Sequence, residues 1–338
     1  MKKRLFGDLN GQPVEEVVLE NAHAAVSVIS LGCRTRDWRV HSAAGTLPII
    51  LGFESVGDYV HHSKAHGAVV GRIANRTAQS SFELDGKTYC LSANDGPDSQ
   101  HHLHGGTCGL ADRVWEMEVD TAAEAVELRY HSPDGEEGYP GSVDFTVRYR
   151  LQGRKLICEM HGVPDRPTPI NLAHHNYFNL AGAGDVRDHM LWVDAEFFTP
   201  VDDDLLPLGS FAEVADTRLD FRTPRTIEAT DPSFEGLDHN FVLRDGRDAR
   251  ALAAWASCDR SGLKLEVVTD QPGMQIFNAA EMVIAAPGLE GRVYGRFSGL
   301  CFEAQHYPDS MHNPHWPSII RTPEAPYFQR LEIGISQT

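Results

Sequence analysis

Residues 299–309, with the sequence GLCFEAQHYPD, can place a carboxylate where it acts as a base. If this segment forms a strand, its apolar residues at positions 300, 302 and 304 face a core, and Glu303 and Gln305 face the opposite side. A carboxylate on a rigid strand keeps a fixed position against a small polar substrate. Glu303 is therefore a candidate general base.

A second segment, NLAHHNYFNL at residues 171–180, is dense in polar groups between apolar neighbours. In an extended conformation His175, Tyr177 and Asn179 share one face, and His174 lies on the other face with Asn176 and Phe178. An imidazole gains or loses a proton near neutral pH, which suits a general acid. The alternative is a pair of structural histidines, each hydrogen-bonded inside the protein.

Two glycine-containing segments add hydrogen-bonding groups. In HHLHGG, residues 101–106, the glycines allow close backbone approach to His104. A zinc site is conceivable there, but neither helical i,i+4 ligand spacing nor a CxxC pair occurs, so a hydroxyl-binding His104 is favoured and no metal is expected. In GRIANR, residues 71–76, Asn75 and Arg76 are good donors to sugar or carboxylate oxygens, unless Arg76 only pairs with a surface acid.

Two further polar residues could serve a site. Asp238, in the turn-like segment GLDHN, can accept hydrogen bonds, although Asp in turns often bonds its own backbone. Gln275 lies between apolar Met274 and Ile276, so it is buried or points into a pocket, and a buried amide needs partners. The five tryptophans could stack on a sugar, but their wide spacing is more typical of core residues.

Short alternating or apolar runs separated by turn residues must position these groups. They occur at 14–19, 24–29, 125–130, 143–151, 156–161 and 263–268, a spacing typical of an all-β sandwich. Asp85-Gly86 predicts a β-hairpin within 82–91, because this pair tolerates the positive φ angles of a type I′ turn. Helical periodicity is limited to 55–62 and 249–256. With no break in composition, we expect one domain over residues 1–338.

Composition restricts the partners. The 338 residues are 41% hydrophobic and 23% charged, with a formal net charge of -18, which disfavours nucleic acid or an anionic membrane and favours a neutral or cationic small molecule. No apolar stretch follows the basic N-terminal residues and none is long enough to span a bilayer, so a cytoplasmic protein is expected. The six scattered cysteines predict reduced thiols.

Together these segments resemble the aldose 1-epimerase (galactose mutarotase) family in order and spacing along nearly the whole chain. The matching strings are GRIANR, HLHGG, DGEEGYPG, NLAHHNYFNL, GLDHNF and FEAQHYPDS, with further likeness in TPVDDDLLPLG and LDFRTP. The resemblance implies a large antiparallel β-sandwich of the galactose mutarotase-like (supersandwich) type with few short helices, and an open carbohydrate site. It also implies that neither metal nor organic cofactor is used.

The resemblance further implies roles for single residues. Glu303 corresponds to the base that takes the proton from the C1 hydroxyl, and His175 to the acid that protonates the ring oxygen. Side chains that correspond to the sugar-binding positions are Asn75, Arg76, His104, Asp238 and Gln275. These roles predict a Glu303 pKa low enough for ionisation at neutral pH and a His175 that can carry a proton.

Some positions depart from the family pattern. Asn176 follows the acid where Ser or Thr is usual, His174 precedes it in place of Asn, and Phe277-Asn278 replaces an aromatic-hydroxyl pair. The preferred aldose therefore stays open among galactose, glucose and pentoses, and so does the choice between monomer and homodimer. Two rivals remain: a non-catalytic carbohydrate-binding module, and a glycoside hydrolase that uses Asp238 and Glu303.

Overall fold

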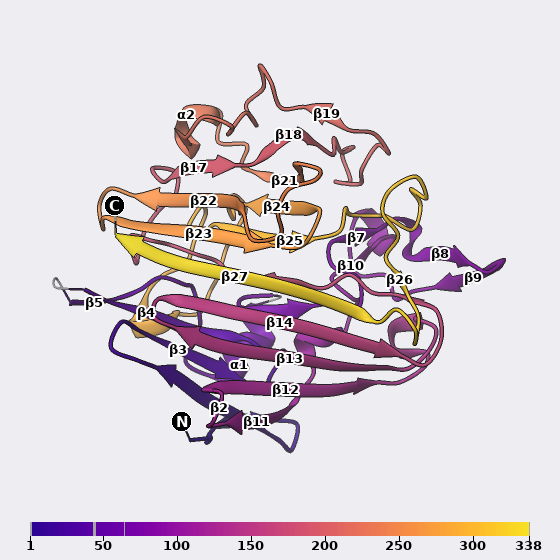
Figure 1. Ribbon diagram of the computed structural model, residues 1–338, viewed down its shortest axis with the longest axis horizontal. Coiled ribbons are helices and arrows are strands. Elements are labelled where there is room, and N and C mark those ends of the chain that lie inside the picture. The colour runs from indigo at the N-terminus through magenta and orange to yellow at the C-terminus, as the bar shows by residue number, and fades with distance from the viewer. Residues whose placement is uncertain (1, 43–44, 64, 338) are drawn as a thin grey trace.

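The computed structural model describes residues 2–42, 45–63 and 65–337, and most of its regular structure is β-strand. One large sheet crosses the front of Figure 1, with long β27 near its centre. Its strands pair antiparallel in the order β11-β12-β13-β14-β27-β23-β22-β17-β20. Their bounds are Glu116–Asp120, Ala125–Ser132, Val143–Gln152, Lys155–Pro164, Tyr327–Gln337, Leu263–Thr269, Leu252–Cys258, Met190–Val193 and Arg225–Thr226.

Two five-stranded antiparallel sheets pack against it. The first contains β1 to β5: Arg4–Leu9, Gln12–Glu20, Ala24–Ile29, Thr35–Ser42 and Gly45–Pro48. The second has the order β19-β18-β21-β24-β25, with bounds Ala212–Glu213, Ala195–Phe198, Asp238–Leu243, Gly273–Phe277 and Cys301–Gln305. One core cluster contains side chains from all three sheets, including Val26, Val147 and Phe302. The molecule is therefore a large antiparallel β-sandwich, as predicted.

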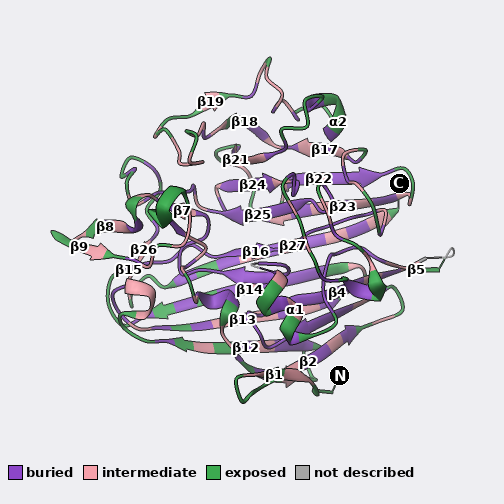
Figure 2. Cartoon of the chain, turned by 180° about the vertical axis from the view of Figure 1, so that it is seen from behind, coloured by how far each residue is buried: buried purple, intermediate pink, exposed green. Residues whose placement is uncertain are grey.

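The core explains the alternation in the sequence. Along β13, buried residues alternate with exposed or half-buried ones over the whole strand, so only one face of this strand packs inward. Seen from behind in Figure 2, the strands of the packed sheets carry long buried stretches, whereas most connecting loops are exposed. All six predicted strand runs lie in strands, namely β2, β3, β12, β13, β14 and β23.

Shorter pairs of strands complete the structure. They are β7 (Arg76–Thr77) with β10 (His102–Leu103), β6 (Ala68–Val70) with β16 (Ala173–His175), β15 (Thr168–Pro169) with β26 (Ile320–Arg321), and β8 (Ser81–Leu84) with β9 (Lys87–Cys90). The β8–β9 pair is the predicted hairpin, and both turn residues have positive φ, 51° at Asp85 and 72° at Gly86.

Helical structure is short. The helices are α1 (Val56–His62) and α2 (Ile227–Thr230), with 3-10 turns at Ala78–Ser80, Pro97–Ser99, Leu110–Asp112, Glu136–Gly138 and Leu289–Gly291. The prediction at 55–62 is confirmed: Ser55 caps α1 by accepting a hydrogen bond from the Asp58 backbone. The prediction at 249–256 is wrong, because its second half is strand β22, where pairing with β17 and β23 overrides a weak helical pattern. Among the described residues no helix is long and apolar enough to cross a membrane.

Backbone pairing brings the two most important segments together. Beyond β16, the Phe178 backbone N–H donates to the Leu300 carbonyl at 2.8 Å, and the two residues form an antiparallel bridge. Three residues back from Phe178 is His175, and three residues on from Leu300 is Glu303. An antiparallel arrangement therefore brings His175 near Glu303.

Gly105 fixes the loop that carries His104. Its φ is +90°, and a Cβ there would lie 1.6 Å from the Gly71 carbonyl oxygen. Gly86 also has a positive φ, +72°, but a Cβ there would meet no described atom within 4 Å. A side chain at Gly86 would therefore introduce backbone strain alone, whereas a side chain at Gly105 would add a steric clash.

We expect Gly105→Ala to lower the free energy of unfolding well beyond the roughly 1–2 kcal/mol of left-handed backbone strain that Gly86→Ala introduces. The added loss comes from the displaced backbone around Gly71. Urea denaturation followed by circular dichroism measures both variants. Equal losses would contradict the steric argument.

Candidate active site

The predicted residues line a pocket of about 160 Å³ between the second five-stranded sheet, the β6–β16 pair and the β7–β10 pair. Six of the seven predicted side chains are in its wall, and Gln275 lies beside it, bonded to Asp238. The wall consists of Ala65, Asn75, Arg76, Leu103, His104, His175, Tyr177, Asp238, Phe277 and Glu303. Segments far apart in the sequence therefore meet at one small site.

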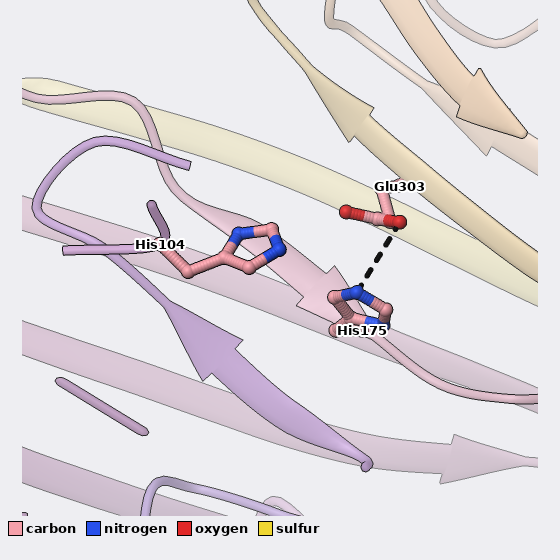
Figure 3. A group of neighbouring side chains, drawn as sticks. All are labelled: His104, His175 and Glu303. Atoms are coloured by element: carbon pink, nitrogen blue, oxygen red, sulfur yellow. Dashed lines mark ion pairs between the residues drawn. The ribbon is translucent and has the colours of Figure 1, made fainter. Parts of the chain in front are cut away.

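His175 and Glu303 form a close pair in its wall (Figure 3). The His175 Nε2 atom lies 3.4 Å from the Glu303 Oε1 atom, and the two residues are 4% and 2% exposed. The Tyr177 ring stacks on the His175 ring, with centroids 4.9 Å apart, and His66 stacks on the other side of Tyr177 at 4.1 Å. This stack fixes the imidazole plane so that Nε2 faces the carboxyl group.

Burial shifts both groups toward their uncharged forms. Desolvation, assisted by the nearby charge of Asp238, raises the pKa of Glu303 well above its usual value. Desolvation lowers the pKa of His175 to about 4. Both directions are opposite to those expected for an ionised Glu303 beside a readily protonated His175. Both shifts favour a proton on the carboxyl group over a proton on the imidazole.

A polar network adjoins the pair. The Arg76 Nε atom donates to Asp95 Oδ2 at 2.8 Å, and its Nη1 atom lies 4.0 Å from Asp238 Oδ2. Gln275 Nε2 donates to Asp238 Oδ1 at 2.6 Å. The sequence placed Asp238 in a turn-like segment. In the structure it is instead the first residue of strand β21. The network holds a guanidinium and a carboxylate at the pocket wall, where both can bind hydroxyl groups.

His104 faces the pair from the opposite wall, and its ring meets the His175 ring edge to face at 5.2 Å. The Asn75 backbone N–H donates to His104 Nδ1 at 3.1 Å. A neutral imidazole that accepts at Nδ1 carries its proton on Nε2. The N–H donor of His104 is therefore Nε2, and its hydroxyl-binding role stays a prediction.

His104, His175 and Glu303 also form a set of possible metal ligands, with one ligand atom from each within 4.8 Å of the others. A metal-bound imidazole normally donates its second N–H to an acceptor. His104 Nδ1 instead accepts from Asn75, and His175 Nδ1 is buried with no hydrogen-bond partner in the described part of the chain. These surroundings do not fit a metal site.

Sequence reasoning missed part of the wall. Tyr177 and Phe277 supply its aromatic surface, with their rings 6.1 Å apart, whereas none of the described residues lining the pocket is a tryptophan. Tyr177 could have been found, because it shares a strand face with His175. Asp95, which binds Arg76, lies in a loop whose sequence has no distinguishing pattern.

Comparison with known proteins relates the whole chain to one family. The aldose 1-epimerase family model matches residues 15–334. Galactose mutarotase from Bos taurus is 38% identical over 332 residues, which are 96% of this chain and 95% of that protein. Aldose 1-epimerase from Escherichia coli K12 is 32% identical over 91% of this chain and 90% of its own length.

Solved structures agree with this relationship. Galactose 1-epimerase from Lactobacillus acidophilus superposes with a TM-score of 0.84 at 28% identity, covering 99% of this chain and 98% of that one. An aldose epimerase homologue from C. elegans superposes with a TM-score of 0.89 at 26% identity, covering 96% and 99%. The sequence and structure comparisons therefore identify the same family.

Several buried imidazoles predict that stability depends on pH. Burial lowers the pKa to about 3 for His66 and His174, and to about 4 for His175, His239 and His306. Between pH 6.5 and 4 the unfolded chain binds more protons at these groups than the folded protein does. Their contribution to the free energy of unfolding is therefore lost as the pH falls.

We expect His174→Leu to reduce this pH dependence by up to about 1.4 kcal/mol per pH unit, the effect of one proton. Urea denaturation at pH 7, 6 and 5 measures the slope. The exposed His23, replaced by Gln, is the control and should leave it unchanged. A His174→Leu slope equal to that of the wild type would contradict the assignment.

Proposed function

The chain belongs to the aldose 1-epimerase family, and we propose that it interconverts the α and β anomers of a free aldose with Glu303 as the base and His175 as the acid. The observation that carries this assignment is the 3.4 Å contact between His175 and Glu303 in the wall of the pocket. A carboxyl group and an imidazole that share one proton are the two groups that ring opening requires.

The reaction begins when the pair takes its ionic form. Transfer of the shared proton from Glu303 to His175 leaves a carboxylate and an imidazolium. Glu303 then accepts the proton of the C1 hydroxyl while His175 donates its proton to the ring oxygen, and the C1–O5 bond breaks to give the open-chain aldehyde. The pair again holds one proton, now on Glu303.

Ring closure reverses these steps on the other carbonyl face. Rotation about the C1–C2 bond turns that face toward O5, His175 takes the proton from the O5 hydroxyl, and Glu303 returns its proton to O1. No net proton is gained or lost, and each group contributes roughly 10²–10⁴ in rate.

Five side chains are proposed to hold the sugar hydroxyls: Asn75, Arg76, His104, Asp238 and Gln275. Arg76 and His104 present N–H donors, and Asp238 presents an acceptor that its bond from Gln275 holds in place. Hydroxyl groups both donate and accept, so a wall of mixed donors and acceptors suits them. Tyr177 and Phe277 offer apolar surface to the C–H groups of the ring.

We further propose a hexose such as galactose or glucose as the substrate, because relatives over nearly the whole chain carry the name galactose mutarotase. Phe277 contributes no hydroxyl to the wall, so the position of the sugar facing it receives no hydrogen bond from this side chain. Arabinose and xylose therefore belong in the same assay. A cytoplasmic location and a monomeric or homodimeric state stay predictions.

Polarimetry of freshly dissolved α-anomers tests the acid and the base. We expect Glu303→Gln and His175→Asn each to lower the rate above the spontaneous background by about 10²–10⁴. Glu16→Gln is the matched control, because Glu16 is also a buried glutamate, 1% exposed, but binds Arg4 and Arg36 away from the pocket. The control should lose stability and keep the rate. Full activity in Glu303→Gln would overturn the assignment.

Asp238→Asn tests sugar binding. A hydrogen bond to a charged group contributes about 1.5–3 kcal/mol, so KM should rise by roughly 10- to 100-fold with a smaller change in kcat. The comparison uses initial rates over a range of sugar concentrations. A variant that loses kcat with an unchanged KM would instead assign Asp238 to the chemical step.

A further inference from the structure

Three adjacent strands present a row of polar side chains on the face that forms the pocket. In the register of β21, β24 and β25, Asn240 pairs with Gln275, and Gln275 pairs with Glu303. The next row toward the C-terminal end of β25 is Val242, Gly273 and Gln305. Because residues two apart on a strand share a face, Gln305 lies on the same side as Glu303, about 7 Å further along.

This polar row is buried but incompletely hydrogen-bonded. Asn240, Gln275 and Gln305 are 1%, 4% and 0% exposed. Neither the Oε1 nor the Nε2 atom of Gln305 has a partner among the residues that the structure describes, and the same holds for Asn240 Oδ1 and Gln275 Oε1. Gln305 is thus a completely buried amide whose side chain makes no hydrogen bond to the described protein.

The Oε2 atom of Glu303 is in the same situation. Oε1 faces His175 (Figure 3), whereas Oε2 is buried without a hydrogen-bond partner in the described ranges. An ionised carboxylate accepts hydrogen bonds at both oxygens. A donor to Oε2 in addition to the C1 hydroxyl would therefore stabilise the carboxylate.

Gly273 is closely surrounded in the second row. A Cβ at this position would come within 2.7 Å of Asn240 Oδ1, 3.0 Å of the Gln305 carbonyl oxygen and 3.1 Å of a Tyr307 ring carbon. The amide oxygen of Asn240 therefore lies over Gly273, between the two rows. A side chain at position 273 would therefore clash with the Asn240 amide and the Gln305 backbone.

Buried amides and carboxylates without partners are unfavourable, and ordered water is the usual way in which proteins satisfy them. A buried water makes about three hydrogen bonds, and the unpaired atoms here offer both donors and acceptors on one face. Glu303 and Gln305 lie about 7 Å apart along β25. A water held between their side chains can bridge that distance.

We propose that Gln305 is a positioning residue for the reaction: with Asn240 it holds buried water against Glu303 Oε2, and this water donates a hydrogen bond to the carboxylate. The inference rests on the proposed role of Glu303 as the base. Gln305 acts only through Glu303 and does not touch the sugar. The water stabilises the ionic form of the pair, which burial otherwise disfavours.

The charged and titratable groups around Glu303 set the sign of the effect. They are His104, His175, Tyr177, Arg76, Asp238 and Cys301. Asp238 opposes ionisation of Glu303 and Arg76 favours it. Loss of the water leaves these groups in place and removes one donor to the carboxylate. The carboxylate then becomes less stable relative to the carboxyl form.

This gives two linked effects on the pH profile of kcat/KM. The plateau falls, because less of the one-proton pair is in the ionic form. The alkaline limb, where the pair loses its last proton, moves to higher pH. Both changes have the same origin, so a limb shift of one pH unit accompanies a tenfold lower plateau. A merely structural defect lowers the plateau and leaves the limb in place.

Gln305→Met is the test variant and Gln329→Met the matched control. Gln329 is also 0% exposed, but its amide is bonded: Nε2 donates to the Ala304 carbonyl at 2.8 Å, and Oε1 accepts from the Tyr327 hydroxyl. We expect Gln305→Met to raise the alkaline limb by about one pH unit and to lower the plateau about tenfold. Gln329→Met should lose stability without moving the limb. If the alkaline limb lies at the same pH in the wild type, Gln305→Met and Gln329→Met, the proposal is overturned.

A second measurement does not depend on turnover. Infrared difference spectra follow the C=O band of the protonated carboxyl group, which is assigned to Glu303 by its loss in Glu303→Gln. The pH at which this band disappears should rise in Gln305→Met and stay unchanged in Gln329→Met. If the band moves while wild type accelerates no sugar, Gln305 keeps its role and the proposed enzyme function fails. If the band does not move, the role of Gln305 is wrong.

If Gln305→Met does not fold, the wild-type protein still decides the question. A crystal structure at a resolution that shows ordered water should contain a water within hydrogen-bond distance of both Glu303 Oε2 and the Gln305 amide. Finding these atoms without such a water would overturn the proposal.

Discussion

A carboxyl group and an imidazole that face each other at 3.4 Å with almost no solvent contact impose the main constraint on this structure. Charging either group alone in this place is unfavourable, because burial removes the water that would stabilise the charge. One proton shared by the two groups avoids that cost. The surrounding protein must therefore hold both groups closely enough for the proton to move between them.

Backbone hydrogen bonds, rather than the reach of long side chains, hold His175 and Glu303 this close together. His175 is the last residue of β16, and the chain just beyond it is hydrogen-bonded to Leu300, the residue before β25. One antiparallel arrangement therefore places both His175 and Glu303. The stack of Tyr177 on His175 then fixes the ring plane. His104 reaches the opposite wall from a loop in which Gly105 packs against the Gly71 carbonyl at a distance that excludes any side chain. Sheets thus position the proton-transfer pair, and tight loops position groups that contact the sugar.

The parts of this arrangement that depend on local pattern could be predicted from the sequence. Period-two alternation identified the strands, Asp85-Gly86 identified a hairpin, and the shared face of His175 and Tyr177 is observed as ring stacking. Features that depend on distant segments could not be predicted. The side of β25 that carries Glu303 is polar, yet it is buried, because segments near residues 75, 104 and 175 cover it. That burial reversed the expected direction of both pKa shifts.

The same burial links ionisation to substrate binding. In the ligand-free protein burial raises the pKa of Glu303 and lowers that of His175, and both shifts disfavour the ionic form of the pair. A sugar in the pocket places a C1 hydroxyl against the carboxyl group and a ring oxygen against the imidazole. A hydroxyl that donates to the carboxylate, and an oxygen that accepts from the imidazolium, both favour the ionic form. The substrate thereby supplies part of the stabilisation that burial removed, and the reactive charge distribution forms when the reacting atoms are in place.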